Sequence, residues 1–140
     1  MSDRYFLDTN ILVYSFDKRV PEKQQIAQDL IANGLKSGKA IISYQVIQEF
    51  INVSTRKFNP PLSYPDAEKY FERILTPLYE VPSSVEMFSK ALSIAERWKY
   101  SFYDALIIAG ALLSNCAILY SADLQQQQIE QLKVVNPFAD

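Results

Sequence analysis

The sequence predicts an α/β domain built around a parallel sheet, and two observations support this fold class. Short apolar runs, typical of strands buried on both faces, alternate along the chain with longer segments in which apolar residues recur every three or four positions. Strands and helices that alternate in this way are typical of a parallel sheet covered by helices. No low-complexity linker, internal repeat or break in composition divides the 140 residues, so we expect a single domain over residues 1–140.

Four or five of the apolar runs are predicted to be strands. In chain order they are RYFLD (residues 4–8), KAIIS (39–43), the shorter YEVP (79–82), AILYS (117–121) and KVVNP (133–137). Most are continuous runs rather than alternations of apolar and polar residues, as expected for central strands. We therefore expect a sheet of four to five strands that is mainly parallel.

Helices are predicted between these strands from their periodicity and end signals. The segments are 11–16, 21–37, 44–58, 66–78, 84–98, 101–115 and 122–132. The second has Pro21 in its first turn and Gly38 after its end, both ordinary boundary signals. Successive prolines in NPPLSYP (59–65) break the chain before the fourth, because proline cannot donate a backbone hydrogen bond.

Composition limits the class of protein. With 49% apolar and 13% aromatic residues, the chain is too hydrophobic for a disordered protein. The apolar runs are shorter than the roughly 20 residues that span a bilayer, and the N-terminus lacks the pattern of a secretory signal. The single cysteine, Cys116, cannot form an internal disulfide, which agrees with a reducing compartment. We expect a cytoplasmic protein without a membrane segment.

The absence of histidine narrows the chemistry. It excludes histidine acid–base catalysis, Ser-His-Asp and Cys-His sites and His-ligated zinc, and a single cysteine excludes thiolate metal clusters. The remaining carboxylates, hydroxyls and amides are oxygen donors that suit hard cations such as Mg²⁺ or Mn²⁺. A net charge of −2 and a pI of about 5.2 argue against a protein that coats nucleic acid through bulk charge, but they leave room for a local basic rim.

Four carboxylates are expected at one edge of the sheet. Asp8 follows the first strand and Asp123 follows AILYS at nearly the same offset, and residues at the carboxyl ends of parallel strands converge in one crevice. Glu49 lies in the helix after KAIIS, and Asp104 lies in the first turn of the helix after Ser101. Carboxylates that converge repel one another unless a cation neutralises them, so their convergence predicts a metal site.

Each carboxylate also has an interpretation that needs no function. Asp8 and Asp123 are good N-cap residues for the helices predicted after them. Asp104 can form a capping box with Ser101. Glu49, taken alone, is most simply a solvated residue on a helix surface. We prefer the joint site, because four such coincidences at one edge are the weaker explanation.

Four motifs follow one another over nearly the whole chain: FLDTNILVY, SYQVIQEF, FYDALIIAGALLSNCAILYSADLQ and LKVVNPF. They resemble the successive motifs of the PIN-domain ribonucleases, in particular the VapC-like toxins of toxin–antitoxin pairs. The resemblance implies a three-layer α/β/α fold with a central, mainly parallel sheet. The site residues that it implies are the catalytic and metal-binding quartet Asp8, Glu49, Asp104 and Asp123, with Thr9, Asn10 and Ser121 as supporting polar groups.

By this resemblance the chain would be a Mg²⁺- or Mn²⁺-dependent ribonuclease, the toxin of its pair, that hydrolyses RNA phosphodiester bonds. The residues suit that chemistry, because metal-assisted hydrolysis proceeds without histidine. We expect Asp8 and Asp104 as direct ligands, with Glu49 and Asp123 binding a second ion or holding waters of the first. Relatives often carry a further acid where this chain has Ala122, which leaves the number of metal ions open.

The resemblance also implies partners: an RNA substrate, an antitoxin with a segment laid in a groove, and a second copy in a homodimer. The helices over 21–37 and 66–75 are amphipathic, and their apolar faces can bury against an antitoxin or simply against the chain's own core. RNA phosphates need positive charge and RNA bases need exposed rings. The candidates for phosphates are Lys18, Arg19, Arg56, Lys57, Arg73, Arg97 and Lys99, each of which is more simply a solvated surface residue. The candidates for bases are Tyr14, Phe16, Phe102 and Tyr103, with Phe16 and Phe102 expected in the core.

Two other functions compete with a ribonuclease. A phosphatase of the haloacid-dehalogenase type also places an Asp after its first strand, but it needs a second Asp where this chain has Asn10. A catalytically inactive PIN-like module that binds RNA or protein would keep the fold without turnover. Metal binding without cleavage of RNA would favour that alternative.

Overall fold

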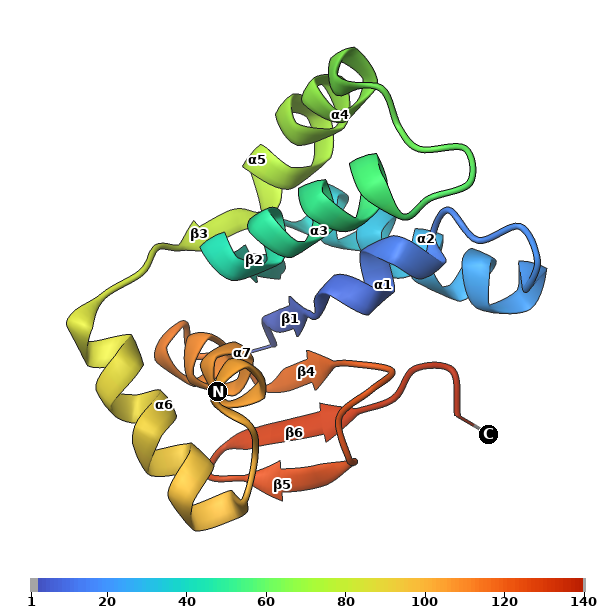
Figure 1. Cartoon of the computed structure of the whole chain (residues 1–140). Coiled ribbons are helices and arrows are strands. Elements are labelled where there is room, and N and C mark those ends of the chain that lie inside the picture. The colour runs from blue at the N-terminus through green and yellow to red at the C-terminus, as the bar shows by residue number, and fades with distance from the viewer. Residues whose placement is uncertain (1–2, 140) are drawn as a thin grey trace.

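The computed structural model describes residues 3–139, in which helices cover a six-stranded sheet (Figure 1). The strands are β1 (Tyr5–Leu7), β2 (Ala40–Ser43), β3 (Tyr79–Val81), β4 (Ile118–Tyr120), β5 (Gln127–Ile129) and β6 (Leu132–Val135). The helices are α1 (Thr9–Tyr14), α2 (Pro21–Ser37), α3 (Tyr44–Arg56), α4 (Tyr64–Tyr70), α5 (Thr76–Leu78), α6 (Val85–Trp98) and α7 (Phe102–Leu113), and a π-helical segment, η1 (Phe71–Leu75), joins α4 to α5. The expected α/β fold is confirmed.

The order of the strands brings several carboxyl ends to one edge of the sheet. The order is β3-β2-β1-β4-β6-β5, and every neighbouring pair is parallel except β5 with β6. The central β1 sets Phe6 opposite Ile41 of β2 and Leu119 of β4. Because β1, β2, β4 and β6 run in the same direction, the residues that follow them meet at that edge.

Helices cover both faces of the sheet, because successive side chains along a strand point to opposite faces. The hydroxyl of Tyr5 donates to the carbonyl of Leu30 on α2 at 2.8 Å. The next residue, Phe6, lies on the other face, with a ring atom 3.7 Å from where a Cβ on Gly110 of α7 would be. Helix α6 packs along α7, so the three layers are α2, the sheet, and α6 with α7.

The segment predicted as a helix over 122–132 is instead a strand and a turn, so that prediction was wrong. β5 pairs antiparallel with β6, with Ile129 opposite Leu132. Both of these side chains are fully buried, and Glu130 takes a left-handed backbone conformation with φ 54° at the turn. The glutamine run has good helix propensity, but the hairpin buries Ile129 and Leu132 against the core. The sheet therefore has six strands, where four or five were expected.

The helix expected over 66–78 is present but irregular. Ser63 caps it by accepting a hydrogen bond from the N–H of Asp66 at 3.1 Å. Its middle turn widens into the π-helical segment η1 before α5. Pro77 has no N–H to donate to the carbonyl of Arg73, four residues earlier in η1, which gives a physical reason for the irregular turn.

The other expected elements, including the short strand at 79–82, are present with small shifts at their ends. Within residues 3–139, no helix combines the length and the apolar character needed to cross a membrane.

Substitution of Gly34 by alanine tests how closely α2 packs against β2. A methyl group on Gly34 would lie 2.1 Å from Cβ of Ala40, so Gly34→Ala must push the helix away from the sheet. We expect it to lower the free energy of unfolding by about 1–3 kcal/mol, measured by urea denaturation. Gly110→Ala on α7 is the matched control, because its nearest contacts would be ordinary ones at 3.6 and 3.7 Å and alanine favours a helix by up to about 1 kcal/mol. Equal changes in the two variants would contradict this packing.

Candidate active site

Two loops that follow neighbouring strands are joined at the carboxyl edge of the sheet. The backbone N–H of Asp8, directly after β1, donates to the carbonyl of Tyr120 at the end of β4, at 3.0 Å. The N–H of Ser121 donates in turn to the carbonyl of Val135 at the end of β6, also at 3.0 Å. The parallel pairing thus continues past the strands and sets Asp8 beside Ser121.

Asp8 is the buried centre of the site, with only 9% of its surface exposed. Its Oδ1 accepts a hydrogen bond from the N–H of Thr9 at 2.8 Å. Its Oδ2 accepts from the hydroxyl of Ser121 at 2.8 Å and from the amide of Asn10 at 3.3 Å. The first bond caps α1, so the capping interpretation is confirmed for one oxygen. The other oxygen belongs to a polar network outside the helix.

Asn10 and Ser121 link Asp8 to Asp123. The Asn10 amide donates to Oδ2 of Asp123 at 3.2 Å, and its own oxygen accepts from the N–H of Ala122 at 2.9 Å. The Ser121 hydroxyl accepts from the N–H of Asp123 at 3.2 Å. Residues 124–139 contain no helix, so the interpretation of Asp123 as a helix N-cap was wrong.

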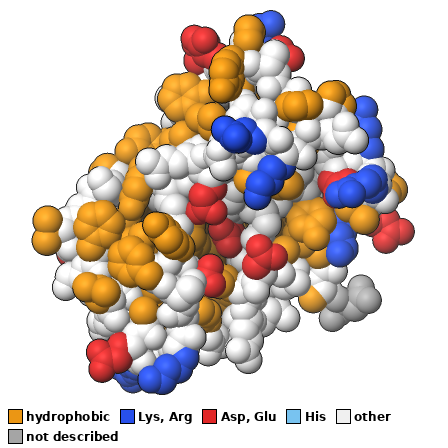
Figure 2. All heavy atoms as spheres, in the orientation of Figure 1, with side chains coloured by type: hydrophobic (Ala, Val, Ile, Leu, Met, Phe, Trp, Pro, Cys, Tyr) orange, Lys and Arg blue, Asp and Glu red, His pale blue; other side chains and the backbone are white. Residues whose placement is uncertain are grey.

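Glu49 and Asp104 reach the same edge from two helices. Glu49 lies in the second turn of α3, which starts directly after β2, and Asp104 lies in the first turn of α7. The charge of Glu49 raises the pKa of Asp8, and the charge of Asp104 raises the pKa of Glu49, so the carboxylates are electrostatic neighbours. Figure 2 shows acidic side chains gathered in a hollow near the middle of one face, with an apolar area on one side and lysines and arginines on the other.

Asp104 also takes part in the cap of α7. Its N–H donates to the hydroxyl of Ser101 at 3.3 Å, which is one half of the predicted capping box. The reciprocal bond, from the Ser101 N–H to the Asp104 carboxylate, is absent from residues 3–139. Asp104, Glu49 and Asp123 are exposed as whole residues, although the Glu49 carboxyl is partly buried; the charges of Glu49 and Asp123 act on the buried Asp8, and that of Asp104 acts on Glu49.

Burial is the main cause that raises the pKa of Asp8 from its ordinary 3.8 to about 6. The hydrogen bonds from Ser121 and Thr9 oppose this rise, and the charges of Glu49 and Asp123 add to it. Partial burial likewise raises the pKa of Glu49. A cation bound near Asp8 would stabilise its ionised carboxylate.

The oxygen atoms at this edge are of the chemical type that binds hard divalent cations. Carboxylate and hydroxyl oxygens are ligands that Mg²⁺ and Mn²⁺ prefer. Within residues 3–139, the hydroxyls of Thr9, the first residue of α1, and of Ser43, the last residue of β2, are buried without a hydrogen-bond partner, which leaves oxygen atoms at this edge for a ligand or its water shell. In this conformation, however, no three Asp, Glu, Cys or His side chains of residues 3–139 converge closely enough to hold an ion. Coordination requires the exposed carboxylates to turn toward Asp8.

The four aromatic side chains considered for base stacking differ in their exposure to solvent. The ring of Phe16 packs against Phe50, so its expected core role is confirmed. Tyr14 is half-buried against the C-terminal segment. Phe102 was expected in the core but is 37% exposed, so that expectation was wrong. Tyr103, the residue before Asp104, is 71% exposed and is the ring most open to a ligand near the acids.

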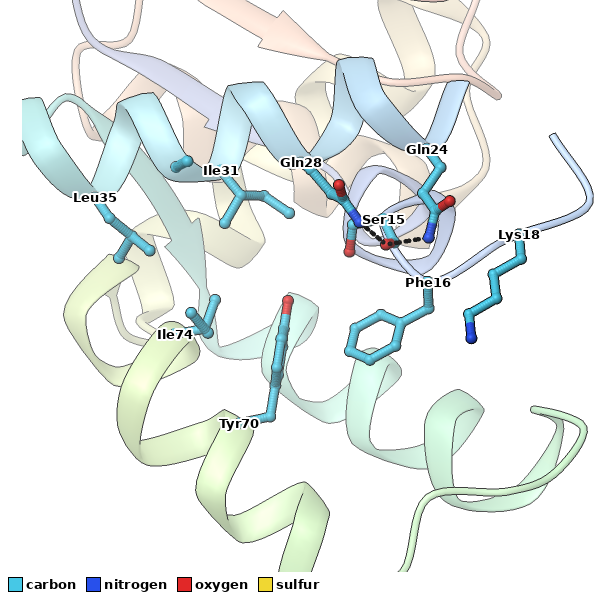
Figure 3. A pocket seen from close by; sticks show the side chains of 10 residues that line it. Ser15, Phe16, Lys18, Gln24, Gln28, Ile31, Leu35, Tyr70 and Ile74 are labelled. Atoms are coloured by element: carbon cyan, nitrogen blue, oxygen red, sulfur yellow. Dashed lines mark hydrogen bonds between the residues drawn. The ribbon is translucent and has the colours of Figure 1, made fainter. Parts of the chain in front are cut away.

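A separate cavity of about 440 Å³ lies between α2 and the helix of α4 and η1 (Figure 3). Its walls are mainly apolar and include Ile31 and Leu35 of α2 and Ile74 of η1, with the hydroxyl of Tyr70 pointing into it. None of the four carboxylates lines it. The two helices predicted to be amphipathic therefore leave part of their apolar faces open between them.

Comparison with known proteins identifies the fold. The PIN domain family model matches residues 5–132. A toxin–antitoxin complex from Klebsiella pneumoniae contains a chain with a TM-score of 0.66 and 18% identity, over 96% of this chain and 98% of that chain. VapBC2 from Rickettsia felis, bound to a DNA fragment from its promoter, gives a TM-score of 0.66 and 19% identity over 94% and 97%. VapC20 from Mycobacterium tuberculosis, described as a Sarcin-Ricin loop cleaving toxin, gives 0.59 and 18% over 85% and 91%. No curated protein sequence matches significantly.

Asp8→Asn tests whether the buried carboxylate opposes folding. A pKa of about 6 in the folded protein, against 3.8 in the unfolded chain, means that the folded state binds the Asp8 proton more tightly. Ionisation of Asp8 therefore weakens folding as the pH rises through this range, by about 3 kcal/mol once it is complete. Neutral asparagine does not carry this cost. We expect metal-free Asp8→Asn to exceed the wild type in free energy of unfolding at pH 7.5, and the gain to vanish at pH 4.

Urea denaturation in EDTA at the two pH values measures the gain. A difference between variant and wild type that stays constant with pH would contradict the account. Only a group that titrates differently in the folded and unfolded chains makes stability depend on pH.

Proposed function

The chain belongs to the PIN domain family, and from this we propose that it is a Mg²⁺- or Mn²⁺-dependent ribonuclease, the toxin of a toxin–antitoxin pair. The observation that carries the proposal is the network in which Asn10 and Ser121 join the buried Asp8 to Asp123 at the carboxyl edge of the sheet. Hydrolysis of RNA phosphodiester bonds at this edge accounts for an acidic site in a chain without histidine.

We assign each of the four carboxylates a role according to its position in the site. Asp8, oriented by Ser121 and by the N-terminus of α1, and Asp104 are the proposed direct ligands of the cation. The exposed Glu49 and Asp123 hold water molecules or a second ion, and one of them accepts a proton from the attacking water. When bound, Mg²⁺ or Mn²⁺ lowers the pKa of a water molecule and neutralises charge on the phosphate and the leaving oxygen.

RNA contacts on this acidic chain depend on side chains around the hollow. Tyr103 is largely exposed beside Asp104, where its ring can stack on an unpaired base. Arg56 and Lys57 are exposed at the end of α3, the helix that carries Glu49, and are proposed to contact phosphates. Cleavage of the Sarcin-Ricin loop by VapC20, which shares the fold, supports RNA as the substrate class.

A catalytically inactive PIN-like module is the second candidate. It is favoured by the observation that no three carboxylates of residues 3–139 converge in this conformation. The phosphatase alternative is weaker, because both ends of the Asn10 amide are engaged with Asp123 and Ala122, and no second acid occupies that position.

The cavity between α2 and the helix of α4 and η1 is the proposed site of the antitoxin. It opens between two amphipathic helices and offers the apolar side chains of Ile31, Leu35 and Ile74 to an inserted segment. Solved complexes that share the fold are toxin–antitoxin assemblies, which supports an antitoxin as the occupant.

A second copy of the chain is the other proposed partner. The outer face of α6 exposes Val85, Phe88 and Leu92, at 85%, 41% and 61%. Contiguous apolar residues of this kind mark interaction surfaces in soluble proteins. We therefore propose this face of α6 as the homodimer interface.

Cleavage of a panel of structured RNAs tests the nuclease. We expect purified protein to cut RNA in Mg²⁺ or Mn²⁺ and to lose the activity in EDTA. Asp8→Asn and Asp104→Asn should lower the rate by roughly 100-fold or more, because each removes a charge that stabilises the transition state through the cation. Glu96→Gln, at an exposed position on α6, is the matched control and should cut like the wild type.

Cutting that persists in EDTA, or that is equal in Asp8→Asn and Glu96→Gln, would contradict the proposal. Binding of Mn²⁺ without cleavage of any RNA in the panel would favour the inactive module instead.

Ala32→Arg tests the antitoxin cavity. Ala32 is exposed on α2 and lines the cavity, so an arginine there obstructs it at little cost to folding. We expect the variant to bind its antitoxin at least about 10-fold more weakly while it keeps ribonuclease activity. Co-purification with a co-expressed antitoxin that binds the wild type measures binding. Asn33→Arg, also exposed on α2 but outside the cavity lining, is the control. Equal binding by both variants would contradict the cavity as the antitoxin-binding site.

A further inference from the structure

Gln45 is a buried amide in a helix whose neighbouring polar residues face solvent. It is 6% exposed, whereas Gln48 and Glu49 on the same helix, α3, are exposed. A buried amide costs free energy unless hydrogen bonds replace its contacts with water. An apolar residue would fill this position without that cost, so the bonds made by Gln45 need an explanation. Sequence reasoning did not single out this residue.

The first bond of Gln45 crosses from one helix to another. Its Nε2 donates to the backbone carbonyl of Tyr103, the residue before Asp104, at 3.1 Å. The main packing partners of α3 are α1, α4 and β2, whereas those of α7 are α6 and β4. Within residues 3–139, this is the hydrogen bond that joins α3 to α7. It therefore ties the start of the helix that carries Asp104 to the helix that carries Glu49.

The second contact of Gln45 is with Glu49. The two residues are four positions apart on α3, so their side chains lie on the same face one turn apart. Burial and the charge of the nearby Asp104 raise the pKa of Glu49, and the neighbouring Gln45 amide opposes that rise. The amide thus supports the charged form of Glu49 where a second carboxylate opposes it.

The two contacts fix the orientation of the amide. A carbonyl and a carboxylate both accept hydrogen bonds, so both need the NH₂ end of Gln45. Its Oε1 is buried without a hydrogen-bond partner among the described residues 3–139, so the NH₂ end makes the bond that places the side chain. The Gln45 amide is neutral and offers two N–H donors between the Tyr103 carbonyl and Glu49. Such a group can hold the negatively charged Glu49 and Asp104 near each other without adding charge.

We propose that Gln45 is a positioning residue that holds α3, which carries Glu49, and the start of α7, which carries Asp104, at the separation that the site needs. This inference rests on the ribonuclease proposed above. Gln45 touches neither RNA nor the cation; it acts through Glu49 and through the backbone at the start of α7. Loss of a partner that orients a metal-site carboxylate typically lowers activity or metal affinity by about 10- to 100-fold.

Gln45→Met is the first test, because methionine keeps the length of the side chain and removes both donors. We expect kcat for RNA cleavage to fall about 10- to 100-fold with little change in KM, because the RNA contacts remain. The affinity for Mn²⁺, measured by calorimetry without RNA, should fall to a similar extent. Gln48→Met, the same change at the exposed neighbour, should leave kcat, KM and Mn²⁺ affinity unchanged.

A double-variant cycle separates positioning from packing. If Gln45 acts partly through Glu49, Gln45→Met should cost less Mn²⁺ affinity in a Glu49→Gln background than in the wild type, because only the tie to α7 remains to be lost. Fully additive losses would overturn the proposal. If Gln45→Met does not fold, Gln45→Glu replaces it, since the shape is kept and the donors become an acceptor; wild-type kinetics in that variant would also overturn it.

The outcomes distinguish this inference from the function on which it rests. Wild-type protein that neither cuts RNA nor binds Mn²⁺ overturns the proposed ribonuclease. Active wild type together with a Gln45→Met variant that matches Gln48→Met overturns the role of Gln45 and leaves the ribonuclease in place.

Discussion

The site depends on one constraint: the carboxylate of Asp8 is held at the end of a buried strand, where little water reaches it. Burial disfavours its charge, and hydrogen bonds from Ser121 and Thr9 favour it, so that its pKa lies at about 6. The charges of Glu49 and Asp123 make ionisation harder still. A cation at this edge would relieve both the burial and the repulsion. Helix capping accounts for one oxygen of Asp8, and the remaining network needs a further reason.

The fold supplies this position through the direction of its strands. Parallel pairing of β1 with β4 and of β4 with β6 continues into the loops and sets Asp8 beside Ser121. The helix after β2 adds Glu49, and the cap of α7 adds Asp104. These carboxylates come from segments far apart in the chain, so the site forms only when the sheet and both helical layers are assembled.

Sequence reasoning could predict that Asp8 and Asp123 lie at the same edge, because they follow two parallel strands, β1 and β4, that are neighbours in the sheet. Sequence reasoning failed where contacts between segments far apart in the chain determine the local structure. The glutamine run before Ile129 favours a helix locally, but pairing with β6 buries that isoleucine and makes a hairpin. The bond from Gln45 to the Tyr103 carbonyl joins two layers, and no periodicity encodes such a bond. The single domain, the cytoplasmic location and the roles of the site residues stay predictions.

Anomalous diffraction from crystals grown with Mn²⁺ tests the central claim most directly, since it locates a bound ion without depending on the choice of RNA. The account predicts an anomalous peak within about 2.0–2.6 Å of carboxylate oxygens of Asp8 and Asp104, with Glu49 and Asp123 turned toward it. A well-ordered structure at saturating Mn²⁺ with no peak at the carboxyl edge, or with peaks only elsewhere on the surface, would contradict it.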